Sequence, residues 1–258
     1  MHVDLKTQKL RTALRNNCKK IIENLVENNI QRNKKVPALP DICMFCGSPN
    51  NLTKEHVLPR WVFDNSTKRF FITDINGLSQ TYIKTTIPAC LNCNSGILNS
   101  LEKYIQKIFE NRNIKMNPFS LEELENIIRW LDVIDYKFQI LNIRRTFKAS
   151  KKAGYIPYLA DFPLSVLRKS IDYSPSKTLT EIRRSQKRVF TKNKNKNINS
   201  LVAFKTKNKG FYFFHHMDDF IFLELPKHQI AIFYFYKRVF GDELSAYREA
   251  MEMIKTAY

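Results

Sequence analysis

The sequence predicts an α+β protein, on two observations. Apolar residues recur every three or four positions in three segments of the first 140 residues, a spacing typical of helices that bury one face. Runs rich in aromatic and β-branched residues follow at about 200–206, 210–216, 219–225 and 228–236, which favours an antiparallel meander. We therefore expect a helical arm at 1–36, a cysteine-containing core at 37–117, and a C-terminal α+β region at 118–258.

The helices of the first half follow from periodicity and end signals. An apolar stripe predicts a helix over about 4–30, and a second stripe begins at Ile97 and ends before Pro118. Ser120 and Glu123 form a capping box, in which each residue satisfies a backbone N–H of the first helical turn. The third helix therefore begins there and is expected to reach about residue 140.

Turn and composition signals predict further segments. Asn76-Gly77 favours a hairpin turn between the strand-like segments 68–73 and 80–86. The Lys-Asn repeat at 192–197 predicts an exposed loop. The stretch 215–219, with two His and two Asp, offers ligands for a second metal but is better explained as a strand end and turn. A final helix opens at Asp242-Glu243, with its apolar face expected at Leu244, Tyr247, Met251, Ile254 and Tyr258.

The positive charge is large and unevenly distributed. Lys and Arg number 43 against 24 Asp and Glu, a net charge of +19. Residues 1–36 carry nine basic and three acidic side chains, and residues 140–200 carry fifteen and three, whereas 37–139 is neutral. A concentrated excess indicates a polyanionic partner, nucleic acid first and an anionic membrane surface second. The alternative is codon bias toward Lys in an AT-rich genome.

Several classes of protein are excluded by missing motifs. The chain contains no GxGxxG and no GxxxxGK[ST], so dinucleotide-binding and P-loop folds are not expected. It has no run of about 18 apolar residues and no signal peptide. We therefore expect no membrane association and a cytoplasmic location.

Four cysteines form two CxxC pairs, Cys43 with Cys46 and Cys90 with Cys93. Paired CxxC motifs are typical of a four-thiolate Zn²⁺ site, because each tight turn directs two sulfurs at one ion. Disulfides or redox pairs are the alternative, and disulfides are rare in the cytosol. The long spacer predicts an insertion between the pairs. Because four thiolates leave no open position, the zinc is expected to be structural. Cys18 belongs to the first helix and is expected in the core.

A second group of chemically capable residues stands beside these cysteines. Glu55-His56 precedes Val57, Leu58 and Pro59, and Asn94 directly follows the last cysteine. CxxC, an acidic-His pair with Pro nearby, and CxxC-Asn opening a helix together resemble the HNH (ββα-metal) endonuclease family. The pattern looks most like its zinc-bearing subgroup, which includes McrA-type restriction enzymes and phage junction-resolving endonucleases. The resemblance covers about residues 41–105 and implies a zinc-stabilised ββα-metal core that cleaves DNA, with a role in restriction or phage defence.

The resemblance also implies roles for individual residues. His56 is expected to be the general base, and Glu55 and Asn94 to bind Mg²⁺ or Mn²⁺ through hard oxygen atoms. Each has an alternative: His56 as a structural histidine near the zinc, and Asn94 as a helix N-cap. We expect Glu102 to form a salt bridge. Arg60 is a candidate phosphate contact or a surface ion pair.

Some assignments stay open from the sequence. The family's middle asparagine has three candidates, Asn65, Asn76 and Asn92. The rival to a nuclease is a non-catalytic zinc-ribbon protein that binds nucleic acid or acts as a scaffold, and a second rival is an HNH nuclease that cuts RNA. The C-terminal region is a candidate for contacting a protein partner of a defence complex.

The basic stretch 140–200 contains one candidate DNA-binding cluster. Arg183, Arg184, Lys187 and Arg188 are three to four residues apart, so a helix would gather them on one side. Such a cluster suits phosphates better than base edges. A solvated basic face is the alternative.

Overall fold

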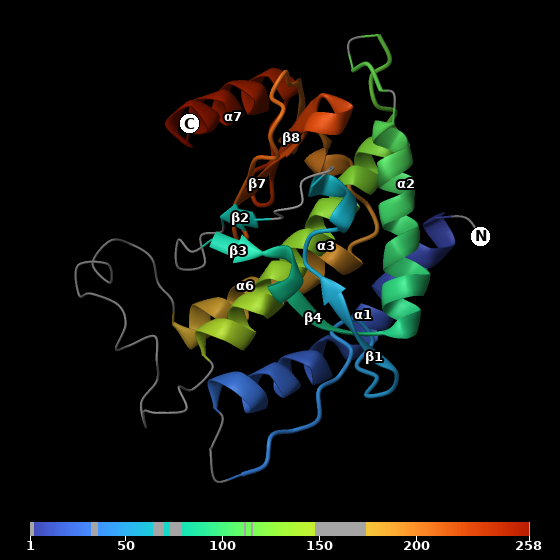
Figure 1. Cartoon of the computed structure of the whole chain (residues 1–258), viewed down its shortest axis with the longest axis vertical. Coiled ribbons are helices and arrows are strands. Elements are labelled where there is room, and N and C mark those ends of the chain that lie inside the picture. The colour runs from blue at the N-terminus through green and yellow to red at the C-terminus, as the bar shows by residue number, and fades with distance from the viewer. Residues whose placement is uncertain are drawn as a thin grey trace, which may run out of the picture.

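The computed structural model describes residues 3–31, 36–63, 70–72, 79–110, 112–114, 116–147 and 174–257. Helices combine with antiparallel strands, which confirms the α+β prediction (Figure 1). The helices are α1 (Val3–Leu25), α2 (Asn99–Phe109), α3 (Leu121–Thr146), α6 (Pro175–Phe190) and α7 (Glu243–Ala257). The strands are β1 (Leu52–His56), β2 (Phe70–Ile72), β3 (Ser79–Thr81), β4 (Thr86–Cys90), β5 (Leu201–Lys205), β6 (Phe213–His216), β7 (Phe220–Leu225) and β8 (Ile230–Phe235). Short 3₁₀ or π turns are η1 (Val26–Ile30), η2 (Arg60–Phe63), η3 (Tyr82–Lys84), η4 (Asn92–Leu98), η5 (Asn195–Ser200) and η6 (Pro226–His228).

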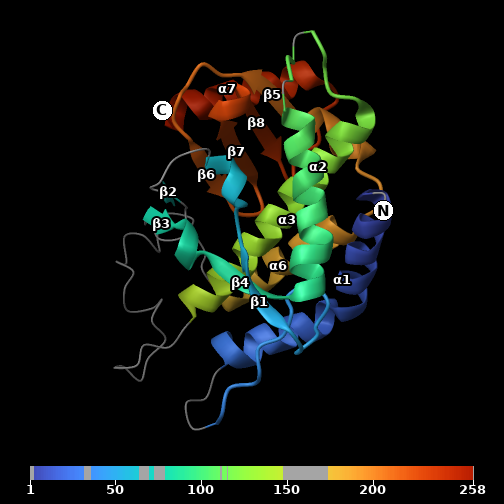
Figure 2. The ribbon, with the colours of Figure 1, turned by 45° about the vertical axis from the view of Figure 1, so that its right-hand side comes forward.

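Helix α3 runs through the middle of the molecule (Figures 1 and 2). It begins at the predicted capping box: the Ser120 side chain accepts from the Glu123 N–H, and the Glu123 carboxylate accepts from the Ser120 N–H at 2.8 Å. All side chains from 130 to 143 are buried, as in a helix that packs on every side. No helix in the described part of the chain is long and apolar enough to cross a membrane.

One apolar core joins residues of all three predicted regions. It extends from Leu10 on α1, through the first CxxC turn, to Tyr236 after β8. Tyr136 of α3 donates a hydrogen bond to the carbonyl of Met44, inside that turn, at 2.6 Å. Central helix and cysteine region are therefore packed directly together.

The four-stranded sheet has the order β5-β8-β7-β6. Strands β6, β7 and β8 form the predicted meander, but the prediction was wrong for β5, which pairs with β8 instead of β6. Leu201 of β5 lies opposite Tyr234 of β8. Strand β8 (IAIFYF) has no charged residue, and all six of its side chains are buried. Such a strand suits an interior position, where it has a neighbouring strand on each side.

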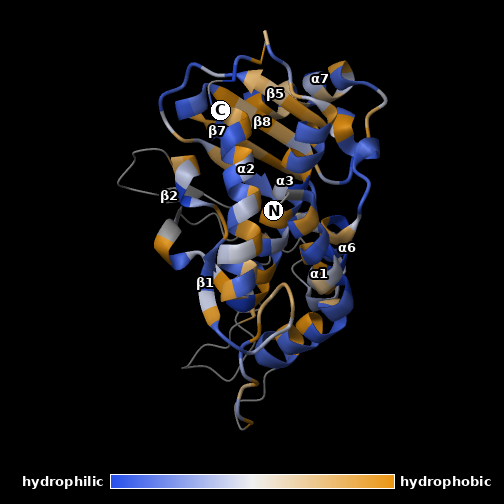
Figure 3. Ribbon diagram, turned by 90° about the vertical axis from the view of Figure 1, so that its right-hand side faces the viewer, coloured by the Kyte–Doolittle hydropathy of each residue, from blue (hydrophilic) through white to orange (hydrophobic). Residues whose placement is uncertain are grey.

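The two faces of this sheet are covered by different helices. Successive residues of a strand face opposite sides of the sheet. On β7, Leu223 belongs to the main core around α3, whereas the adjacent Phe222 belongs to a smaller core under α7 together with Phe233 of β8. Figure 3 shows the resulting hydrophobic strands. Helix α7 packs through Ala246 and Ala250, with Ile254 partly buried against the same core. The predicted apolar face was therefore correct at Ile254 and wrong at Leu244 and Tyr247, which are 57% and 42% exposed, while Tyr258 lies outside the described residues. The small alanines let α7 approach the aromatic sheet closely.

Three loop predictions have mixed outcomes. Strands β2 and β3 pair antiparallel, which confirms the hairpin strands, while Asn76 and Gly77 lie outside the described residues. Strand β6 ends at His216 and a turn follows, as predicted. The 192–197 loop is only partly exposed, because Lys194 is buried in an ion pair with Asp132 at 2.6 Å.

Candidate metal centre and catalytic site

The four paired cysteines converge on one point. Their sulfur atoms all lie within 4.8 Å of one another, and the sulfurs of Cys46 and Cys90 are 3.6 Å apart. Cys43, Cys90 and Cys93 are buried. Four thiols in one cluster are the donor set of a structural Zn²⁺ site, so the residues fit the predicted metal.

The first CxxC pair is shaped by a tight turn. Gly47 N–H donates to the Cys43 carbonyl at 2.8 Å, and Gly47 has φ +68°, a left-handed conformation that favours glycine. The Cys93 thiol and nearby backbone N–H groups donate toward the Cys43 sulfur, and together they lower the pKa of Cys43 to about 5 although burial opposes this. Burial raises the pKa of Cys46. The cluster thus favours thiolate at Cys43 and thiol at Cys46, whereas a bound divalent cation would favour thiolate at all four sulfurs.

The second pair is placed by the β1–β4 hairpin and the helix after it. Cys90 ends β4, and Cys93 lies in η4, which leads into α2. Met44 N–H donates to the Pro88 carbonyl at 3.0 Å, which fixes the first CxxC turn against β4. The β2–β3 hairpin is inserted between β1 and β4, as the long spacer predicted. Two antiparallel strands followed by a helix, with the cysteines at one end, make the local order strand, strand, helix (Figure 2).

Glu55 and His56 stand at the end of β1. Opposite them on β4 are Ile87 and Thr86. Because successive residues of a strand face opposite ways, the Glu55 side chain is buried whereas His56 is only half-buried. His56 is the last residue of the strand, and the chain bends immediately after it.

The Glu55 carboxylate is not free: it contacts the buried ammonium group of Lys137 on α3. Lys137 Nζ also lies 3.3 Å from a carboxylate oxygen of Glu102 on α2 and donates to the His56 carbonyl at 3.1 Å. Burial alone would lower the pKa of Lys137, but the two carboxylates raise it. Burial raises the pKa of Glu102, with Lys137 acting in the opposite direction. The predicted salt bridge of Glu102 is thus confirmed.

Lys137 is the site residue that the sequence analysis missed. It lies in the middle of an apolar helical stretch in which every side chain is buried. Lys137 is the one basic residue between positions 130 and 143, and that was the available signal, because buried lysines almost always have an acidic partner.

Asn94 lies on the helix side of the hairpin, in the π-helical turn η4. Its Nδ2 donates to the Thr53 hydroxyl at 2.9 Å, which holds the side chain against β1 two residues before Glu55. Leu91 occupies the N-cap position and no side chain caps this helix, so the N-cap alternative for Asn94 is not met. With Nδ2 bound to Thr53, Oδ1 is the atom that remains for a metal. π-Helical turns occur frequently at functional sites.

The remaining candidates near this hairpin are spread more widely. Arg60 is exposed at the start of η2, whose Trp61 stacks on Trp130 with ring centroids 5.5 Å apart. Asn92 is exposed between the cysteines of the second pair. Asn65 and Asn76 lie outside the described residues.

The four basic residues of α6 do not share one environment. Arg183, Arg184 and Lys187 are exposed, and Arg184 lies 3.4 Å from an Asp218 oxygen. Arg188 has a side chain only 15% exposed. It forms ion pairs with three buried aspartates, Asp132, Asp135 and Asp218. Arg188 is therefore committed to the interior, which leaves three of the four on the surface.

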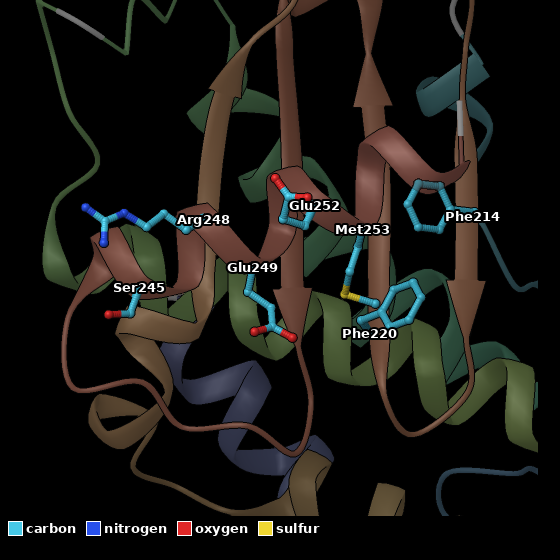
Figure 4. A pocket seen from close by; sticks show the side chains of 7 residues that line it. All are labelled: Phe214, Phe220, Ser245, Arg248, Glu249, Glu252 and Met253. Atoms are coloured by element: carbon cyan, nitrogen blue, oxygen red, sulfur yellow. The ribbon is translucent and has the colours of Figure 1, made fainter.

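A groove of about 790 Å³ lies between α7 and the strands β6 and β7 (Figure 4). Its lining residues are Phe214, Phe220, Ser245, Arg248, Glu249, Glu252 and Met253. The two glutamates have basic partners, Arg238 and Lys255. The groove contains none of the residues predicted from the sequence.

Comparison of the chain with protein families, curated proteins and solved structures found no match. The geometry of the cysteine cluster and the hairpin is therefore the basis for any functional assignment.

Proposed function

We propose that the chain is a metal-dependent endonuclease of the HNH type that hydrolyses phosphodiester bonds in DNA. One observation carries the proposal: Asn94, directly after the last cysteine, reaches across to β1 beside Glu55-His56, within a strand–strand–helix unit bounded by four cysteines. This is the order in which an HNH site presents its residues. A zinc-ribbon fold alone does not need an acidic-His pair at this place.

The proposed roles follow from the chemistry of each side chain. His56, half-buried at a strand end, would take a proton from the attacking water. The amide oxygen of Asn94 is a hard donor suited to Mg²⁺ or Mn²⁺. When bound, such an ion would stabilise charge on the scissile phosphate and the leaving oxygen. The four cysteines would hold a structural zinc that fixes the hairpin relative to the helix.

Glu55 is the residue whose proposed role meets an obstacle. A metal ion at its carboxylate would compete with the ammonium group of Lys137 for the same oxygens. We therefore assign the metal contact to Asn94. Glu55 would bind the metal only if its carboxylate separated from the ammonium group of Lys137.

The ion-paired Glu55 is also the specific observation that favours the rival function. A Glu55 carboxylate paired with Lys137, whose ammonium group also contacts Glu102, is the arrangement expected of a structural cluster in a non-catalytic zinc-binding protein. Such a protein would bind nucleic acid without cutting it. Cleavage therefore decides between the two proposals.

The test is cleavage of supercoiled plasmid by the purified chain, with Mg²⁺, Mn²⁺, Zn²⁺ or no added metal. We expect nicking or linearisation with Mg²⁺ or Mn²⁺ and none with Zn²⁺ alone. Asn94→Ala should reduce cleavage, whereas Asn94→Asp, which keeps a hard oxygen, should retain it.

Thr53→Val removes the hydrogen bond that holds Asn94 against β1 but keeps the amide oxygen itself, so it should reduce cleavage less than Asn94→Ala does. Cleavage that persists after divalent ions are removed, with the zinc retained, would contradict the metal-dependent mechanism. If the chain binds plasmid and never cuts it, the zinc-binding alternative stands. Parallel assays on single-stranded DNA and RNA distinguish the substrate. The restriction or phage-defence role and a partner at the C-terminal region stay predictions.

A further inference from the structure

The two basic segments of the sequence, far apart in the chain, lie side by side in the fold. Gln186 of α6 donates to the Cys18 carbonyl of α1 at 3.3 Å, and Arg15 donates to the Phe190 carbonyl at 3.1 Å. The Arg15 guanidinium also lies over the Phe190 ring, 5.5 Å from its centroid. Since Arg15 precedes Cys18 while Phe190 follows Gln186, the two helices run antiparallel (Figure 2).

Both helices carry a basic excess. Helix α1 has six basic and two acidic side chains, and α6 has five and one. Each buries an apolar face, α1 through Leu14 and Ile21 and α6 through Ile182 and Val189. Arg188 is committed to the interior, whereas other basic side chains of both helices are exposed on either side of the line where the helices meet.

Four exposed side chains flank that line. Arg15 and Lys19 are one turn apart on α1, and Arg183 and Lys187 are one turn apart on α6. Each pair lies on the flank of its helix that faces the other helix, because Cys18 and Gln186, which join the two helices, belong to the same flanks. We call these four residues the α1–α6 basic surface.

Like charges crowd at one end of this surface. Burial lowers the pKa of Arg11, and the neighbouring charges of Arg129 and Arg15 lower it further, with Asp4 and Glu125 only partly offsetting them. Arg129 reaches the end of α6, where it donates to the Thr191 carbonyl. Arg129 is already paired with Glu125 at 3.2 Å, so the exposed Arg15 is the guanidinium group of these three that an outside anion can reach and stabilise.

We infer that the α1–α6 basic surface binds the phosphate backbone of duplex nucleic acid. A membrane surface fits less well, because a membrane-binding helix combines basic residues with bulky apolar side chains on its outer face. Leu5, near the start of α1, is the one exposed large apolar side chain on the described parts of these two helices. The inference goes beyond the proposed function, since binding to the backbone requires no cleavage.

The test measures binding of a fluorescent 20-base-pair duplex by the full chain, without divalent metal, over a series of salt concentrations. The variant Lys19→Gln/Arg183→Gln/Lys187→Gln changes three exposed side chains. Its matched control, Lys205→Gln/Lys207→Gln/Lys209→Gln, removes the same charge from the exposed end of β5 and the loop after it. Each phosphate contact contributes about 0.9 to the slope of log K against log salt. We expect the first variant to flatten that slope by about 2 to 3 units and to weaken binding at least tenfold more than the control.

Two further measurements complete the design. Lys19→Arg/Arg183→Lys/Lys187→Arg keeps every charge and should bind as wild type does, and unaltered zinc content shows that each variant is folded. Equal losses in the variant and its matched control would overturn the inference, because net charge alone would then explain binding. Binding to vesicles of phosphatidylserine and phosphatidylcholine without binding to the duplex would also overturn it. Since cleavage is not measured, failure here leaves the nuclease proposal to its own test.

Discussion

The ammonium group of Lys137 on α3 contacts the carboxylate of Glu55 on β1 inside the core, and the same group donates to the His56 carbonyl at 3.1 Å. The proposed catalytic strand end is therefore held by a helix outside the segment that resembles a nuclease. The C-terminal part of the chain thus stabilises the strand end that carries His56.

This relationship predicts a large loss of stability on Lys137→Met. The substitution leaves the buried Glu55 and the half-buried Glu102 without their partner, and breaking a buried pair in this way costs about 3–5 kcal/mol. Urea unfolding measures the loss. In the double variant Lys137→Met/Glu55→Met the cost should be smaller than the sum of the single costs, because the two residues interact. A single variant as stable as wild type would show that the pair does not stabilise the fold.

One zinc ion per chain is the second prediction. Each of Cys43→Ser, Cys46→Ser, Cys90→Ser and Cys93→Ser should lower the yield of folded protein and the zinc content, because metal binding contributes folding free energy. Cys18→Ser is the matched control, since Cys18 lies on α1 outside the cluster. Elemental analysis of protein purified without chelator gives the stoichiometry, and a chain that contains no zinc would rule the site out.

Two arginines of α6, five positions apart, should differ in their effect on stability. Arg188→Met leaves three buried aspartates without their shared partner, so we expect a loss of about 3–5 kcal/mol in the free energy of unfolding. Arg183→Met changes an exposed side chain and should stay within about 0.5 kcal/mol of wild type. Thermal or urea unfolding tests both. Equal stability of the two variants would mean that the aspartate cluster does not need Arg188.

The stability should also depend on pH through Glu181 of α6. Burial raises the pKa of Glu181 to about 7, from an ordinary value of 4.5. The folded chain then holds this proton more tightly than the unfolded chain, so this contribution is complete below pH 4.5 and is lost as the pH rises to about 7. Glu181→Gln should flatten the fall in unfolding free energy between these pH values. Glu23→Gln, which changes an exposed carboxylate, should keep the wild-type dependence of unfolding free energy on pH. If Glu181→Gln shows that same pH dependence, the Glu181 carboxyl does not have a raised pKa in the folded chain.

Local signals predicted much of the fold. The capping box at Ser120 and Glu123 depends on residues three apart, and the cysteine cluster depends on two short motifs. Both could be found because the chemistry that defines them lies within a few residues of chain.

Long-range partners could not be predicted in the same way. The pairing of β5 with β8 depends on which strand is buried most, and the face of α7 depends on the aromatic sheet beneath Ala246 and Ala250. The roles of Arg188 and Lys137 depend on acidic side chains at least 30 positions away in sequence. Charge alone made Arg188 resemble its exposed neighbours, although it is bound inside the protein.

The most direct test of the central proposal is the single-turnover rate of duplex DNA cleavage in Mg²⁺ for wild type and His56→Ala. Loss of a general base typically slows a reaction about 10²–10⁴-fold, and we expect a decrease of that size with zinc content and DNA affinity unchanged. His216→Ala, which alters an exposed histidine on β6, should cut at the wild-type rate. A His56→Ala variant that cuts as fast as wild type would contradict the assignment of an HNH nuclease site.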